Sequence, residues 1–349
     1  MKPARLHVCS LLIATQAVLG CVSSSDLDDV AIDPAEVPDS KADGLATVLP
    51  DVRCTGTPVL PAAISWRHRT SNIISFGKPN HRGFDLIASA SDAKQEIAGA
   101  ASYGLIDKAL VDEQVELYAC RAGAWQALGG AVTDKNGLFK LTLSGAQRLP
   151  IGMRDMYIAI PGDNSGATFL AVVAADGTAA AVSDVDGTLT SSENAYPLSL
   201  ISGADVAIHP NAPAAMAKLR TRGYLPVYVT SRGHVFTAGS RAWLANSGMP
   251  RGPLRLAPTL ITMPGSATAA YKGNVLAQLE SHGIEVAVGI GNRASDIDAY
   301  TSAGVAASAI WIKGPEYDKE VQPKLAAGLA HGFTNYAELS AAIAALPTR

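Results

Sequence analysis

The sequence is poor in aromatic residues, in net charge and in cysteine, and each shortage excludes a class of protein. Aromatic residues make up 6% of the 349 residues and the net charge is −3, so no basic, aromatic-rich surface indicates nucleic-acid binding. Four cysteines in a chain of this length exclude a small disulfide-stabilised scaffold. No apolar run beyond the N-terminal region reaches the roughly 18 residues of a membrane-spanning helix. The 48% of hydrophobic residues instead suits a packed globular chain of about two domains.

The N-terminus has the composition of an export signal. Lys2 and Arg5 precede an apolar stretch, Val8–Leu19, which ends at Gly20 and Cys21. A basic start followed by an apolar segment of this length is typical of a secretory signal peptide. A small residue directly before cysteine resembles the lipobox of bacterial lipoproteins. The sequence therefore predicts that residues 1–21 direct export of a bacterial lipoprotein. We expect it to be anchored to the periplasmic side of a membrane through lipid attached to Cys21, with the outer membrane favoured.

The next segment, residues 22–55, is predicted to be a flexible acidic linker. Residues 22–51 contain eight acidic side chains and a single lysine, with few large apolar residues that could be buried on folding. Cys54 lies at the end of this segment, just before the β-rich domain, and Cys120 lies on an expected strand. In an oxidising compartment these two cysteines could form a disulfide, and the alternative is a pair of unpaired buried thiols.

Residues 60–177 have the pattern of a β-rich domain. The run Val115–Cys120 alternates between apolar and polar residues, and Leu138–Leu143 follows a turn signal at Asp134–Gly137. Short strands separated by polar turns favour an antiparallel, sandwich-like domain. No residue in this part suggests catalysis, so we expect it to support its neighbour.

Residues 178–349 alternate between short apolar strands and longer helical segments. We expect strands at Ala179–Val182, Leu225–Val229, Val286–Ile290 and Ala309–Ile312, and helices at Ala212–Arg222, Val235–Asn246, Thr268–His282, Ala294–Ala303 and Tyr336–Ala345. This alternation predicts an α/β fold, a Rossmann-like open parallel sheet with helices on both faces. In such sheets the ligand site lies at the carboxyl ends of the strands.

Polar motifs follow the expected strands at that edge. The first strand is followed by Asp184-Val185-Asp186-Gly187-Thr188-Leu189-Thr190, the second by Thr230-Ser231-Arg232-Gly233, and the third by Gly291-Asn292-Arg293 with Asp296 shortly after; Lys272 begins a helix. Two carboxylates two residues apart on extended chain can face one site. A divalent cation is the simplest means of holding such close anions together.

These motifs, in this order, resemble the haloacid dehalogenase superfamily. They are most similar to the lipin-type domain shared by the lipin phosphatidate phosphatases and the membrane-associated phosphatidylinositol transfer proteins. The resemblance covers about residues 80–345. It implies a haloacid dehalogenase-type sheet without a large cap, preceded by the β-rich domain. The transfer-protein branch has typically lost the first aspartate and is thought to bind phosphatidate without cleaving it, whereas Asp184 is present here.

The resemblance also implies roles for the residues of the motifs. Asp184 would attack phosphorus, and Asp186 would act as general acid and base. Thr230, Ser231 and Lys272 would bind the phosphoryl group. Mg²⁺ would be held by the Asp184 carboxylate, the Asp186 backbone carbonyl and Asp296, with Asn292 as an outer or weaker ligand.

The function implied by the resemblance is that of a Mg²⁺-dependent phosphatase acting on phosphatidate or a related phospholipid. Two alternatives stay open from the sequence, namely a non-catalytic phosphatidate-binding module and a phosphatase for soluble phosphomonoesters. The expected partners are the phosphoester substrate and, through Cys21, a membrane. The sequence indicates neither a protein partner nor a nucleic acid.

Overall fold

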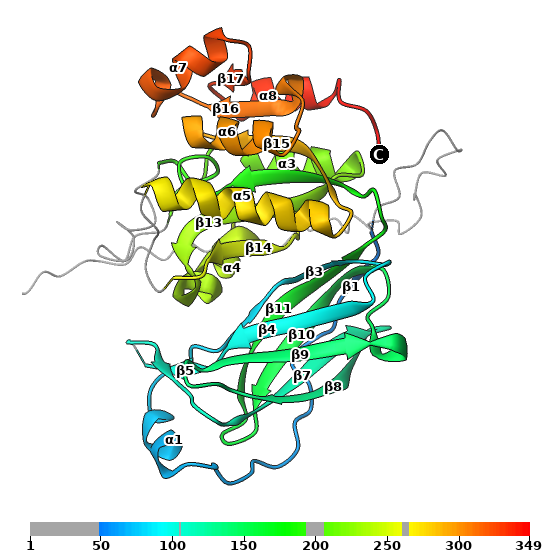
Figure 1. The fold of residues 1–349 in the computed structure, drawn as a ribbon, viewed down its shortest axis with the longest axis vertical. Coiled ribbons are helices and arrows are strands. Elements are labelled where there is room, and N and C mark those ends of the chain that lie inside the picture. Colours follow the sequence, from blue (N-terminus) through cyan, green and yellow to red (C-terminus); the bar gives the residue numbers. More distant parts are fainter. Residues whose placement is uncertain (1–48, 105, 193–205, 260–264) are drawn as a thin grey trace, which may run out of the picture. The chain divides into compact units, whose positions relative to one another are not determined.

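The computed structural model describes residues 49–104, 106–192, 206–259 and 265–349, which lie within one compact unit, Gly44–Arg349. The expected signal segment, Cys21 and most of the expected linker fall outside the described residues. A β-rich part is followed along the chain by an α/β part (Figure 1). Among the described residues, no helix is both long enough and apolar enough to cross a membrane.

The β-rich part is a sandwich of two sheets. One sheet has the strand order β3-β11-β10-β7-β8, with β1 paired to β10, and the other has the order β2-β4-β9. The strands of this part are β1 (Asp51–Val52), β2 (Arg82–Phe84), β3 (Leu86–Ser89), β4 (Lys94–Ala100), β5 (Ser102–Tyr103), β6 (Lys108–Ala109), β7 (Gln114–Arg121), β8 (Ala124–Val132), β9 (Leu138–Ser144), β10 (Gly152–Ile160) and β11 (Ser165–Ala174). A short helix, α1 (Arg69–Ile74), and a 3₁₀ turn at Gly145–Gln147 complete it. Apolar side chains that alternate along the strands, such as Ile97, Leu117 and Ile158, meet in the core.

The sandwich differs from the expectation in one respect. Most of its strand pairs are antiparallel, but β3 pairs with β11, and β1 with β10, in the parallel sense. Both exceptions involve short strands that arrive from distant parts of the chain, which the local sequence pattern cannot indicate. Cys54 and Cys120 form a disulfide with an S–S distance of 2.04 Å, which joins the chain after β1 to β7.

The α/β part contains a six-stranded sheet in which every pair is parallel, in the order β14-β13-β12-β15-β16-β17. Its strands are β12 (Ala179–Asp184), β13 (Leu225–Gly233), β14 (Leu254–Ala257), β15 (Glu285–Gly291), β16 (Ile310–Lys313) and β17 (His331–Phe333), and its helices are α3 (Ala212–Thr221), α4 (Thr237–Asn246), α5 (Gly265–Ser281), α6 (Ala294–Ser302), α7 (Asp318–Ala326) and α8 (Tyr336–Ile343). Two 3₁₀ turns occur at His234–Phe236 and Ala307–Ala309.

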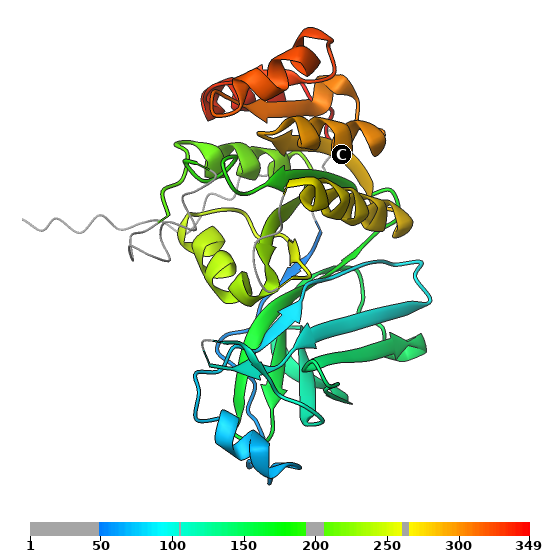
Figure 2. The ribbon, with the colours of Figure 1, turned by 60° about the vertical axis from the view of Figure 1, so that its left-hand side comes forward.

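Helices cover both faces of this sheet (Figure 2). Buried side chains of α5, α6 and α7 belong to one apolar cluster, and those of α3, α4 and α8 belong to a second cluster on the opposite face. The strand β12 is buried along its whole length between them, which explains its continuous apolar sequence. The expected doubly covered parallel sheet is present, with β14 and β17 as edge strands that the sequence did not indicate.

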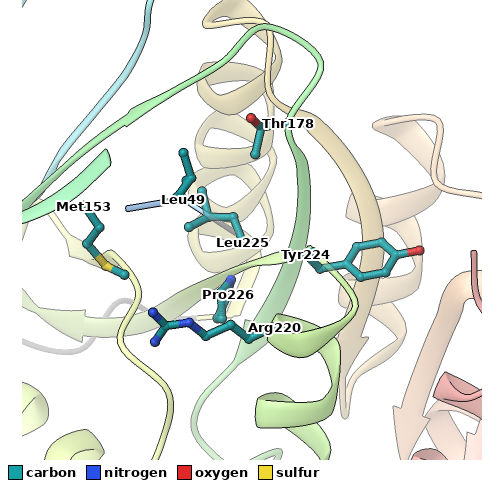
Figure 3. Close-up of a pocket in the computed structure, with 8 residues that line it drawn as sticks. Leu49, Met153, Thr178, Arg220, Tyr224, Leu225 and Pro226 are labelled. Carbon is teal, nitrogen blue, oxygen red and sulfur yellow. The ribbon is translucent and has the colours of Figure 1, made fainter. Parts of the chain in front are cut away.

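One place where the two parts meet lies near the amino ends of β12 and β13. A cavity of about 20 Å³ lies at this junction. Figure 3 shows residues that line it, among them Leu49, Met153, Arg220 and Tyr224. A space of this size holds at most about one water molecule. It is therefore too small to hold a substrate.

Candidate functional site

Asp184 is the last residue of β12, and its carboxylate is almost completely enclosed, with 4% of the residue exposed. One carboxylate oxygen lies 2.6 Å from Nζ of Lys272, and the other accepts a hydrogen bond of 3.0 Å from Oγ1 of Thr188. Burial raises the pKa of the Asp184 carboxyl to about 7, and Lys272 opposes this shift. The residue predicted to be the nucleophile is thus held by two donors at the end of an interior strand.

Lys272 reaches this strand end from α5 and bridges two carboxylates. Its Nζ atom lies 2.6 Å from Oδ1 of Asp184 and 2.6 Å from Oδ1 of Asp296. Burial alone would lower the pKa of Lys272, but the two carboxylates outweigh it and raise the pKa above its ordinary value. Lys272 therefore remains a cation, and its ammonium group has a third proton to donate.

Both carboxylate oxygens of Asp296, in the first turn of α6, accept hydrogen bonds from donors of this chain. Oδ1 contacts Lys272, and Oδ2 accepts hydrogen bonds of 3.0 Å from the backbone N–H groups of Asn292 and Arg293. A carboxylate at this position satisfies donors at the start of the helix and interacts favourably with its dipole. Asp296 thus fixes the turn between β15 and α6.

Asn292 lies in that turn, directly after β15, and only 1% of the residue is exposed. Among the described residues, neither Oδ1 nor Nδ2 of its amide has a hydrogen-bond partner. Leaving a buried polar group unpaired costs about 1–3 kcal/mol, so such a group indicates a ligand that the amide would contact. Strand β15 is the direct neighbour of β12, with Ser183 paired to Ile290, which brings Asn292 to the same edge as Asp184.

The Asp186 side chain binds two residues of β13. Its carboxylate accepts a hydrogen bond of 2.7 Å from Oγ1 of Thr230 and forms an ion pair with Arg232, whose Nη2 lies 2.6 Å from Oδ1. Thr230 and Arg232 are two residues apart on one strand and therefore point to the same side. The sequence left the role of Arg232 open. Its position two residues after Thr230 was the signal that could have indicated a place at the same site. Ser231, between them, is partly buried.

The structure brings the predicted residues other than Ser231 together at one strand edge; Ser231 alternates with Thr230 and Arg232 along β13, so its side chain points to the other side of the strand. Their charges are three carboxylates, from Asp184, Asp186 and Asp296, against the cations of Lys272 and Arg232. Within the described ranges, no group of three or more Asp, Glu, His or Cys side chains is arranged to hold a metal ion. Among the described residues at this edge, the amide of Asn292 has an oxygen that accepts no hydrogen bond and could bind a cation.

Comparison with known proteins gives the family. A family model described as "PITM 1-3, beta-sandwich domain" matches residues 79–173, and one described as "PITM 1-3, LNS2 domain" matches residues 181–314. The chain carries the β-sandwich and LNS2 domains of the membrane-associated phosphatidylinositol transfer protein family. This confirms the resemblance to the lipin-type domain and extends it, as expected, into the β-rich part.

Three relatives show the extent of the likeness between this LNS2-containing chain and the family. Protein retinal degeneration B of Drosophila melanogaster is 27% identical over 71% of the chain, and human membrane-associated phosphatidylinositol transfer proteins 1 and 3 are 27% identical over 74% and 73% of it. The match spans 19%, 20% and 26% of their respective lengths. Among solved structures, apo β-glucuronidase 3 of Bacteroides uniformis, 11% identical over 78% of this chain and 39% of its own, has a TM-score of 0.27, too low to support an argument.

These relatives correct the prediction of an exported bacterial lipoprotein with a signal peptide. They are animal proteins, and the two human ones are named as membrane-associated phosphatidylinositol transfer proteins. The interpretation of the N-terminus as a bacterial export and anchoring signal, which rested on the short pattern ending at Cys21, was therefore wrong. The description as a hydrolase gains no support from these names, which refer to lipid transfer.

Proposed function

We propose that this strand-end site belongs to a Mg²⁺-dependent phosphatase of the haloacid dehalogenase type, acting on phosphatidate or a related phospholipid. The observation that carries the proposal is the Asp184 carboxylate, buried at the end of an interior parallel strand between Lys272 and Thr188. The LNS2 family and the phospholipid named in its members favour a phospholipid over a soluble ester.

The residues present fit a magnesium ion. The Asp184 carboxylate, the Asp186 backbone carbonyl and Oδ1 of Asn292 would hold it, and the unpartnered amide of Asn292 is the observation that supports this set. Asp296, which the sequence suggested as a direct ligand, instead binds Lys272 and two backbone N–H groups, so we assign it to orienting the turn. When bound, the ion neutralises charge on the phosphoryl oxygens.

The chain's own residues perform the transfer. An oxygen of Asp184 attacks phosphorus, the bond from phosphorus to the lipid oxygen breaks, and an aspartyl-phosphate forms. After leaving Arg232, Asp186 takes up a proton from solvent and donates it to the departing alkoxide; as a carboxylate it then removes a proton from the water that hydrolyses the aspartyl-phosphate to inorganic phosphate. The remaining proton of Lys272 and the hydroxyl of Thr230 are available to the phosphoryl oxygens. Asp186 must first exchange its contacts with Arg232 and Thr230 for the substrate.

If Asp186 keeps its contacts with Arg232 and Thr230, a second candidate function, binding without cleavage, is favoured. While both oxygens of Asp186 are occupied by Arg232 and Thr230, the site can receive a phosphate without a general acid for the leaving group. A module in which this ion pair persists would bind phosphatidate without cleaving it.

Phosphate release from vesicles that contain phosphatidate tests the proposal. Wild-type protein is expected to release phosphate with Mg²⁺ and not with EDTA, and Asp184→Asn is expected to lower the rate by at least about a thousandfold because an amide cannot act as nucleophile. Asp298→Asn, at an exposed aspartate on α6, is the matched control and should keep wild-type rates. Glycerol 3-phosphate replaces the vesicles in a parallel assay.

Each outcome separates the candidates. Equal rates for wild type and Asp184→Asn would overturn the mechanism. Cosedimentation with phosphatidate vesicles but no phosphate release would establish the binding module instead. Release from glycerol 3-phosphate alone would assign the enzyme to soluble esters.

A further inference from the structure

A cavity of about 300 Å³ lies beside the edge strand β14, outside the strand-end site. Its apolar walls come from both parts of the chain, with Phe84 and Leu138 from the sandwich and Leu254, Leu256, Pro258 and Val275 from the α/β part. A volume of this size and a mainly apolar lining are typical of small-molecule sites. The cavity is far larger than a packing defect, so it can receive a ligand.

Two polar groups in the cavity walls are buried without partners. Nε of Arg255 and the hydroxyl of Tyr271 form no hydrogen bond within the described part of the chain. Burial raises the pKa of Tyr271, so its hydroxyl stays neutral and can donate a hydrogen bond. Both groups are donors, and leaving them unpaired is costly, so together they select a ligand that brings an acceptor oxygen into an apolar space.

The buried carboxylate of Asp85 does not form a hydrogen bond with the guanidinium group of Arg255. The carboxylate of Asp85 is occupied by Arg241 and by the backbone N–H groups of Leu170 and Leu254. Arg255 instead donates from Nη1 to the backbone carbonyl of Asp85, at 2.6 Å. Its guanidinium group thus faces the cavity with donor capacity that this carboxylate leaves unused.

Residues that line the cavity are neighbours of residues at the strand-end site. Leu256 of β14 is paired with Thr230 of β13, and neighbouring strands lie about 4.8 Å apart. Tyr271 directly precedes Lys272 on α5, so one helix presents the lysine to Asp184 and the tyrosine to the cavity. A molecule with a phosphate at the strand end and an apolar tail could therefore occupy both spaces at once.

We propose that this cavity binds an acyl chain of the phospholipid, with the ester carbonyl accepting hydrogen bonds from Tyr271 and Arg255. The proposal rests on the proposed function because it assumes that the phosphate lies at Asp184. It adds a specificity site, formed between the two parts of the chain, that distinguishes an acylated phosphate ester from a bare one. The sandwich then contributes to substrate choice as well as to support.

Binding measurements in the Asp184→Asn background, which prevents turnover, test the cavity. Isothermal titration compares dioctanoyl phosphatidate, below its critical micelle concentration, with glycerol 3-phosphate. Leu138→Trp and Val275→Trp fill the cavity from its two sides, and each should lower the preference for the acylated ligand at least tenfold. Leu329→Trp, at an equally exposed leucine far along the chain, should leave that preference unchanged.

The donors are tested separately. Tyr271→Phe keeps the shape of the ring and removes the hydroxyl. It should lower the preference for dioctanoyl phosphatidate over its dialkyl ether analogue, which lacks ester carbonyls, by about fivefold, the effect of one hydrogen bond. An unchanged preference in folded Leu138→Trp and Val275→Trp proteins, or an unchanged ester preference in Tyr271→Phe, would overturn the proposal.

A phosphate-free ligand separates this proposal from the proposed function. Dioctanoylglycerol should bind the wild type and lose affinity in Leu138→Trp even if no phosphate ester binds. Failure of both phosphate esters with retained dioctanoylglycerol binding would overturn the phosphatase and support the cavity. Binding of both phosphate esters with no dioctanoylglycerol binding would overturn the cavity proposal and leave the strand-end phosphate site standing.

Discussion

Asn292 and Asp296 lie in the same turn and differ in how their buried polar atoms are satisfied. Each carboxylate oxygen of Asp296 has donors from the chain, whereas both amide atoms of Asn292 lack partners among the described residues. A site that binds a cation must keep some donor oxygens uncommitted until the cation arrives. On the proposed assignment, Asp296 contributes to the stability of the metal-free protein, and Asn292 contributes to Mg²⁺ binding at the expense of stability.

Asn292→Leu is predicted to separate these contributions. The two side chains are similar in size, and the leucine removes an unpaired buried amide, so the free energy of unfolding of the metal-free protein should rise by about 1 kcal/mol. Mg²⁺ affinity should fall at least about tenfold because an oxygen ligand is lost. Urea denaturation in EDTA and calorimetric titration with Mg²⁺ measure the two effects.

The matched substitution Asp296→Leu should have the opposite effect on the free energy of unfolding. Asp296→Leu leaves Lys272 with one carboxylate and uncaps the start of α6, so it should destabilise the metal-free protein by about 3–5 kcal/mol. If Asn292→Leu destabilised the protein similarly, the amide would be a structural group and its assignment as a ligand would fail.

At the scale of the elements, the interior strands were predictable and the edge strands were not. The apolar runs at Ala179–Val182 and Val286–Ile290 lie within β12 and β15, because strands buried on both faces have continuous apolar sequences. The edge strand β14 has four residues, including Arg255, and β17 has three, so neither has a recognisable pattern. The walls of the cavity beside β14 could not be foreseen for this reason.

The sequence likewise predicted which residues meet at the site but not the contacts that they form there. Position after a strand predicted that Asp184, Thr230 and Asn292 would meet, because carboxyl ends of parallel strands share an edge. The resemblance ranked Asp296 above Asn292 as a ligand, but the sequence could not show which donors each side chain meets, and the ranking depends on those donors. It also left open the ion pair of Arg232 with Asp186, which links two strands.

Gly289→Ala tests how β15 positions the site. A methyl group at Gly289 would overlap the ring of Tyr300, which anchors α6 by donating a hydrogen bond of 3.0 Å to the backbone carbonyl of Ile290. Displacing α6 moves the turn that holds Asn292, so we expect destabilisation of about 1–3 kcal/mol together with weaker Mg²⁺ binding. Gly273→Ala, where a methyl group meets open space on α5, is the control, which should raise stability by about 0.5–1 kcal/mol through helix propensity and leave Mg²⁺ affinity unchanged. Wild-type Mg²⁺ affinity in Gly289→Ala would contradict this role of the strand.

At the scale of the whole described unit, polar contacts tie the sandwich to the α/β part. Asp85 of the sandwich accepts from the N–H of Leu254 in β14, and Arg82 donates from Nε to Nδ1 of His234, at 2.8 Å, in the turn after β13. These partners are more than 150 residues apart in the sequence, so no local pattern could predict them. The turn that carries His234 follows directly on Arg232, the partner of Asp186, so the sandwich helps to position the site.

The contact at His234 predicts how this junction responds to acid. Burial, reinforced by Arg82, lowers the pKa of His234 to about 4, whereas the unfolded chain has the ordinary value near 6.5. At a pH between these two pKa values, His234 is protonated in the unfolded state and neutral in the folded state. Stability is therefore lost as the pH falls from about 6.5 to 4. A protonated Nδ1 can no longer accept from Arg82. After allowance for the partial exposure of the ring, we expect His234 to account for about 1–2 kcal/mol.

His234→Asn isolates this contribution, because an asparagine oxygen can replace Nδ1 as acceptor and does not titrate. Burial raises the pKa of Asp184 to about 7, which makes stability fall as the pH rises from about 4 to 7, but wild type and variant share that opposing trend. The difference in free energy of unfolding between them should therefore shift in favour of His234→Asn as the pH is lowered from 7 to 4.5. Urea denaturation in EDTA across this range measures it, and His331→Asn, at an exposed position on β17, is the control. A difference that stays constant with pH would show that the junction does not depend on a neutral His234.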